Sequence, residues 1–119
     1  MIARAHRFHG YNSLRQVYTR GSVVRGQFTA LKFLDNPKRS QYRAAVVVSR
    51  KVHKSAVVRN RIRRRIYEII RLHMKSDGPA YDLVFVVYSE QVAAIPAEEL
   101  EKQIVTQLTK AGAVSGASK

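Results

Sequence analysis

The sequence predicts a two-layer α/β sandwich of the α+β type, with three helices on a mixed sheet of about four strands. Helical and extended segments alternate along the 119 residues. The extended segments 43–49 and 81–89 are almost entirely apolar, as in strands covered on both faces, and the helical segments are apolar on one side only. A chain in which helices and strands alternate in this way typically forms a sheet with helices packed on it. We expect one domain at residues 1–111 and a flexible tail at 112–119.

The first predicted helix covers residues 12–20. Leu14, Val17 and Tyr18 fall on one side of it at helical spacing. Gly21 can end it.

A strand is predicted at residues 27–34, although Lys32 interrupts its apolar alternation. The β-branched segment 22–25 either lengthens this strand or adds another. Residues 35–41 contain Asn-Pro, which predicts a turn. The apolar residues predicted to share one face of the strand are Phe28, Ala30 and Leu34.

Two further helices are predicted, at residues 55–75 and 96–110. Pro96 opens the last one, and its early glutamates suit the positive end of the helix dipole. The apolar stripe of the longer helix lies within an arc of about 120°. It consists of Val58, Ile62, Ile66, Ile69 and Ile70.

The outer surface of the 55–75 helix is unusually basic. Like charges stack at i, i+4, as in Arg59 with Arg63 and Arg61 with Arg65, which destabilises an isolated helix. Glu68 is the one acidic residue between positions 50 and 75. The pattern therefore indicates a surface that faces a polyanion rather than a merely solvated face.

The whole chain is basic, with 22 Lys and Arg against 8 Asp and Glu and a formal net charge of +14. Such an excess repels itself unless a polyanion neutralises it, and nucleic acid is a better candidate than an anionic membrane surface. Arginine forks bind phosphate oxygens in pairs and stack on bases. No helix-turn-helix partner is visible, so the pattern favours RNA over DNA.

Several classes of function are excluded or disfavoured. The sequence contains no cysteine, which excludes disulfides, thiolate catalysis and cysteine-type zinc sites. Scattered carboxylates argue against a two-metal nuclease, and His6 and His9 lack a third ligand. The apolar runs are far shorter than the ~20 residues that span a bilayer, and no secretory signal begins the chain. We expect a soluble, cytoplasmic protein without catalytic side chains.

The motif Arg59-Asn60-Arg61-Ile62-Arg63-Arg64, with "SRKVHKSAVV" before it and "IYEIIR" after it, resembles the protein subunit of bacterial ribonuclease P. The similarity covers nearly the whole chain. It implies the fold of the second domain of ribosomal protein S5, with a left-handed β-α-β crossover. It also implies a role in the endonucleolytic removal of the 5′ leader from precursor tRNA. The chemistry would then belong to Mg²⁺ held mainly by the catalytic RNA.

The resemblance also implies two binding sites. Residues expected to contact the catalytic RNA are Arg59, Asn60, Arg61, Arg63, Arg64 and Arg65. A cleft between the first helix and the sheet would hold the single-stranded leader of precursor tRNA. Its expected residues are Leu14, Tyr18, Phe28, Leu31, Val47, Ser49, Arg50 and Lys51.

Some alternatives remain open. Leu14 and Leu31 occupy positions that are often aromatic in the family, and core packing explains Tyr18 and Leu31 as well as leader contact does. A structural or assembly RNA-binding protein, such as a ribosomal component, would also carry a basic face. Only the ribonuclease P subunit should have a second groove for single-stranded RNA.

Overall fold

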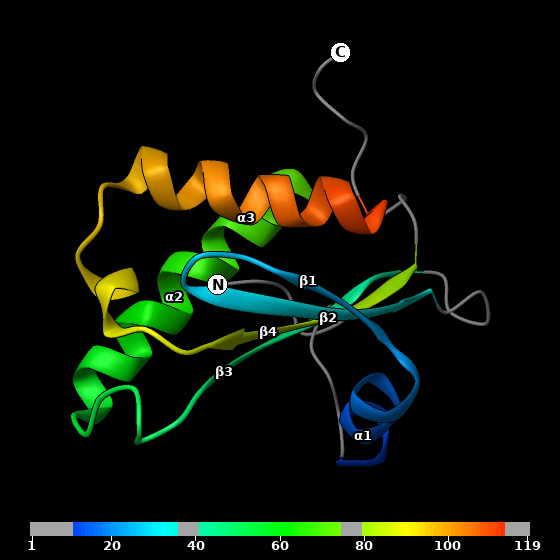
Figure 1. The fold of residues 1–119 in the computed structure, drawn as a ribbon, viewed down its shortest axis with the longest axis horizontal. Helices are drawn as coiled ribbons and strands as arrows, with labels where there is room; N and C mark the ends of the chain where they lie inside the picture. The colour runs from blue at the N-terminus through cyan, green and yellow to red at the C-terminus, as the bar shows by residue number, and fades with distance from the viewer. Residues whose placement is uncertain (1–10, 36–40, 75–79, 114–119) are drawn as a thin grey trace.

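The computed structural model describes residues 11–35, 41–74 and 80–113, with side chains from residue 15 onward. Its four-stranded sheet has two helices on one face and a third, α1, on the other (Figure 1). The elements in chain order are α1 (Tyr11–Arg20), β1 (Ser22–Arg25), β2 (Thr29–Asp35), β3 (Arg43–Val48), α2 (Ala56–His73), β4 (Tyr81–Val87), the 3₁₀ turn η2 (Glu90–Ala93) and α3 (Ala97–Ala111).

The predicted order of helices and strands is confirmed, and so is the mixed sheet. The strand order is β1-β2-β4-β3, with β3 parallel to β4 and both other pairings antiparallel. Segment 22–25 is a strand of its own, because a tight turn in which the Gly26 amide donates to the Thr29 carbonyl (2.8 Å) separates it from β2. The parallel β3-α2-β4 crossover implied by the resemblance is present.

The two faces of the sheet have different partners. Successive strand residues point to opposite faces. In β2, Leu31 and Phe33 pack into the core beneath α2 and α3, whereas Ala30 and Lys32 lie on the face toward α1. The side chains that fill the core beneath α2 and α3 include Leu31, Phe85, Leu83, Ile62, Ile66, Ile70, Leu100, Ile104 and Leu108.

Helix α2 is fixed by the apolar stripe that the sequence predicts. Ile62, Ile66 and Ile70 are fully buried, Ile69 is nearly so, and Val58 packs at the margin of the core. Burying each of these side chains contributes roughly 1.5–3 kcal/mol. Since the buried stripe fixes the rotation of the helix, it also fixes which arginines face outward.

A buried ion pair links β3 to β4. Arg43 and Asp82 are paired in the register of the sheet, and the guanidinium binds the carboxylate with both arms, at 2.9 Å from Nε and 2.8 Å from Nη2. Their side chains are only 8% and 1% exposed. Removing one partner of such a pair leaves a buried charge without its counterpart, which is far more costly than breaking an exposed pair.

We expect Asp82→Ala to lower the free energy of unfolding by about 3–5 kcal/mol. Urea or thermal denaturation measures the change. The matched control is Glu68→Ala, which removes an exposed pair with Arg71 and should have a much smaller effect. Equal losses in the two variants would contradict a special role for the buried pair.

Candidate nucleic-acid interface

The arginine surface comprises Arg59, Asn60, Arg61, Arg63 and Arg64 on the outer side of α2. Ser55 caps the start of this helix, because its hydroxyl accepts a hydrogen bond from the Val58 amide. Within the described ranges, no carboxylate forms an ion pair with any arginine from 59 to 65. The one acid of α2, Glu68, is bound by Arg71, and this hydrogen bond is the main reason why the pKa of Glu68 is lowered.

The arginines of this surface divide into two groups. Arg61 and Arg64 are exposed, and neither makes a hydrogen bond to another described residue. Arg59 donates from Nη1 to the carbonyls of His53 (2.9 Å) and Lys54 (3.0 Å). Arg61 and Arg64 are therefore the cations most open to an external phosphate, while Arg59 also ties the start of α2 to the loop before it.

Arg63 joins α2 to β3, the strand that precedes it in the chain. Its guanidinium donates to the Asn60 side-chain oxygen (2.7 Å) and to the Val48 carbonyl at the end of β3 (3.4 Å). The contact with Asn60 holds that amide in a defined orientation on the exposed side of the helix. The surface is thus partly organised before any ligand arrives.

Arg65 has a structural role that the sequence does not predict. Its two terminal nitrogens donate to the carbonyls of Val92 (2.6 Å) and Ile95 (2.5 Å), which lie in and just after η2. Burial, and then the charge of Arg61, lower the pKa of Arg65. We therefore assign Arg65 to bracing the η2 segment against α2, rather than to the arginine surface.

The second candidate surface is the open face, the side of the sheet toward α1. Cross-strand register places Val23 beside Lys32 and Arg25 beside Ala30 on β1 and β2, and Val47 next to Val86 on β3 and β4. Tyr18 overhangs this face from α1 and is 40% exposed. We define the open face by Tyr18, Val23, Ala30, Lys32, Val47 and Val86.

Tyr18 is held by a neighbouring cation. The Lys32 ammonium lies 4.4 Å from the centre of its ring, a distance at which a cation is attracted to the aromatic face. Partial burial raises the pKa of the Tyr18 hydroxyl above its ordinary value. One flat ring and one positive charge are thus preorganised next to each other.

The position of α1 over this face depends on Gly21. The Gly21 amide donates to the Val17 carbonyl (2.9 Å), which closes the helix. A Cβ atom at this position would lie 2.6 Å from the Phe33 carbonyl oxygen of β2 and 2.5 Å from the Val17 oxygen. Only glycine therefore permits this close passage of the chain from α1 into β1.

The structure corrects two predicted leader contacts. Phe28 is 6% exposed and Leu31 is fully buried, and both belong to the core beneath α2 and α3. The side chain on the opposite face at this point is Lys32, which sequence reasoning missed. Its signal was the interruption of the apolar alternation, because a lone charge in a strand tends to mark the less covered face. The side chain of Leu14 lies outside the described residues.

The remaining predicted residues lie at the far end of the sheet from α1. Val47 is half-buried on the open face, and Ser49, Arg50 and Lys51 are exposed directly after β3. Figure 1 shows this loop leading to the start of α2, at the opposite end from α1. A strand of nucleic acid along the open face would meet Tyr18 and Lys32 first and this loop last, close to the arginine surface.

No cluster of three or more His, Asp or Glu side chains suited to a metal ion occurs among the described residues. None of the helices in the described part of the chain is long and apolar enough to cross a membrane.

Comparison with known proteins agrees with this geometry. A family model described as ribonuclease P matches residues 2–112. The ribonuclease P protein component of Roseiflexus castenholzii is 32% identical over 116 residues, covering 98% of this chain and 93% of the relative. That of a Pseudanabaena species is 34% identical and covers 98% and 99%.

Solved structures share the fold. The RNase P protein of Staphylococcus aureus superimposes with a TM-score of 0.81 at 22% identity, covering 94% of this chain and all of the other. That of Thermotoga maritima gives a TM-score of 0.75 at 17% identity, covering 87% and 96%. The family match and the relatives, with this shared fold, establish that the chain belongs to the ribonuclease P protein family.

Proposed function

We propose that the protein acts through two surfaces: the arginine surface binds the catalytic RNA, and the open face binds the single-stranded 5′ leader of precursor tRNA. Its family makes it the protein component of ribonuclease P, a helper in tRNA 5′ processing with ribonuclease P RNA as its partner. A purely structural or assembly role is not favoured, because the relatives are ribonuclease P proteins over nearly their whole length.

The observation that carries the proposal is the exposure of Arg61 and Arg64 on a helix whose opposite side is locked into the core. A folded RNA offers closely spaced phosphates, and each guanidinium can bind two oxygens of one phosphate. Because Asn60 is already oriented by Arg63, it can add a hydrogen bond to a sugar or base. Shape and backbone contacts of this kind suit structured RNA.

The open face offers a different kind of contact. Tyr18 presents a ring on which one unpaired base can stack, and Lys32 supplies a charge beside it for a phosphate. Farther along, Val47 gives an apolar surface, and Arg50 and Lys51 give two more cations. Stacking with flanking positive charge is the usual way to hold a single strand without strict sequence preference.

In this proposal the polypeptide positions substrate rather than performing chemistry. Mg²⁺, held mainly by the RNA, would supply the metal-ion chemistry of phosphodiester hydrolysis, and the protein would raise the affinity for the leader and for the metal. The complex is then an endonuclease and hydrolase through its RNA, working in the cytoplasm. In this proposal, none of the described side chains acts as a general acid or a general base.

A cleavage assay at low magnesium tests the proposal as a whole. Precursor tRNA is incubated with the protein alone, the RNA subunit alone, or both. We expect cleavage only where the RNA is present and a higher rate when the protein is added. Cleavage by the protein alone, or no gain from adding it, would refute the proposal.

The double variant Arg61→Ala/Arg64→Ala should weaken binding to the RNA subunit. If each arginine meets one duplex phosphate, the slope of log affinity against log salt becomes shallower by about 0.9 per residue. A filter-binding titration at several salt concentrations measures it. Arg65→Ala is the contrasting variant, because it should mainly lower thermal stability by freeing the Val92 and Ile95 carbonyls.

Tyr18→Ala and Lys32→Ala should each lower the affinity of the holoenzyme for precursor tRNA more than for mature tRNA. Loss of a base–aromatic stack costs about 1–3 kcal/mol. Comparing dissociation constants for the two RNAs isolates the leader contribution. Equal losses for both RNAs would remove the open face from leader binding.

A further inference from the structure

A separate pocket of about 270 Å³ lies between the edge strand β1 and α3. It belongs neither to the arginine surface nor to the face beneath α1. One wall is the end of β1 and the turn after it, and the other is one side of α3. Its lining residues are Val24, Arg25, Gly26, Gln27, Lys102, Gln103, Thr106, Gln107 and Lys110.

The walls of this pocket are held by buried polar contacts. Gln107 is 3% exposed, and its amide nitrogen donates to the carbonyls of Val24 (3.1 Å) and Thr29 (3.0 Å). The Thr29 hydroxyl donates back to the Gln107 oxygen at 2.7 Å. A Cβ atom on Gly26 would come within 2.9 Å of the Gln107 side chain, so the turn sits directly on α3. The pocket is therefore a fixed feature of the fold.

The rim of the pocket is positive. Three of its nine lining residues are cations and none is acidic. Arg25, Lys102 and Lys110 are exposed, and none of them forms an ion pair within the described ranges. Lys102, Thr106 and Lys110 follow one another at i, i+4 and i+8, so the two ammonium groups share one side of α3 and their backbone positions are about 12 Å apart.

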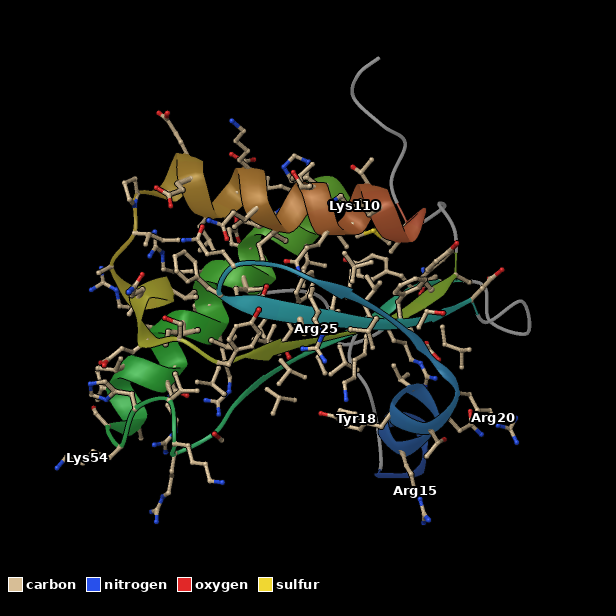
Figure 2. The ribbon with its side chains drawn as sticks, in the orientation of Figure 1. Arg15, Tyr18, Arg20, Arg25, Lys54 and Lys110 are labelled. Carbon is tan, nitrogen blue, oxygen red and sulfur yellow. The ribbon has the colours of Figure 1, made fainter. Side chains whose placement is uncertain are left out.

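Arg25 connects this pocket to the open face. It pairs with Ala30 in the sheet, and Val23 pairs with Lys32. Arg25 is thus the diagonal neighbour of Lys32 on the same face, at a typical Cα separation of about 7–8 Å. Figure 2 shows Arg25 between Tyr18 on α1 and Lys110 on α3 in that view. Positive charge therefore continues from the open face around the edge of β1 to α3.

We propose that the pocket between β1 and α3 is a subsite for a distal, unpaired nucleotide of the leader RNA, beyond the part that meets Tyr18. Arg25 guides the strand over the edge of β1, Lys102 and Lys110 bind its phosphates, and the apolar stems of the lining residues cover one sugar or base. None of the described residues that line the pocket is aromatic, so binding there depends on phosphate charge more than on base identity. This inference rests on the proposed leader-binding function.

The test uses the holoenzyme and a series of precursor tRNAs whose leaders lengthen one nucleotide at a time. In the Lys102→Ala/Lys110→Ala variant, we expect unchanged affinity for short leaders and about tenfold weaker affinity once the leader reaches the pocket. The salt slope for long leaders should become shallower by about 1.4, for two single-strand phosphate contacts. The matched control, Lys102→Arg/Lys110→Arg, keeps the charges and should retain the affinity.

Two outcomes would overturn the subsite. One is equal affinity of the Lys102→Ala/Lys110→Ala variant and the unaltered protein for every leader length. The other is a loss that is independent of leader length, which would assign the pocket to the catalytic RNA or to the body of tRNA. If the open face does not bind the leader, a different result is expected: Tyr18→Ala would lower the affinity for precursor and mature tRNA equally, even with short leaders.

Photo-cross-linking can locate the leader nucleotides that lie at the pocket, in addition to the affinity measurements. Since the chain has no cysteine, Thr106→Cys provides a unique attachment point for a photo-cross-linker on the pocket rim. We expect cross-links to leader nucleotides farther from the cleavage site than those reached from a cysteine at position 23 on the open face. Cross-links confined to the catalytic RNA would contradict the proposal.

Discussion

The burial of one aliphatic side of α2 is the constraint on which the other features of this protein depend. Ile62, Ile66 and Ile70 are inaccessible to solvent, and each contributes roughly 1.5–3 kcal/mol. Stacked like charges on the opposite side cost only a few tenths of a kcal/mol per pair. The apolar contribution exceeds the electrostatic cost by a wide margin, so the helix can keep a dense row of arginines at positions 59–65, none of which pairs with a carboxylate in the described part of the chain.

The arginines of α2 fall into two kinds. They differ in whether the guanidinium binds backbone carbonyls of the domain. Where a guanidinium reaches unpaired carbonyls, as Arg65 does at Val92 and Ile95, it closes the domain. Where it meets none, as at Arg61 and Arg64, it remains available to another molecule. The same residue type therefore stabilises the tertiary structure at one position and leaves a cation exposed to solvent one turn away. Charge counting alone cannot tell these positions apart.

Local periodicity predicted much of the architecture, while long-range pairing determined the rest. The order of elements and the stripe from Val58 to Ile70 followed from spacing along the chain, and the structure confirms them. The sequence does not predict which face of β2 packs against α2 and α3. Alternation shows which residues share a face, but it does not show which face the helices cover. The resemblance predicts Leu31 on the open face, whereas the structure places its neighbour Lys32 there and Leu31 in the core. The Arg43–Asp82 pair depends on parallel pairing of strands separated by α2, which no local pattern reveals.

Gly21 determines how near α1 lies to the sheet, because the chain passes there within contact distance of the Phe33 carbonyl. A single methyl group at that point would have to lift the helix or tilt it. The height of α1 above the sheet is therefore set by an absent side chain, at a position outside both the arginine surface and the open face. In the proposed leader-binding role, selectivity for a single strand over a double helix would originate in the smallest residue of the domain, at a distance from every group that would make the contact.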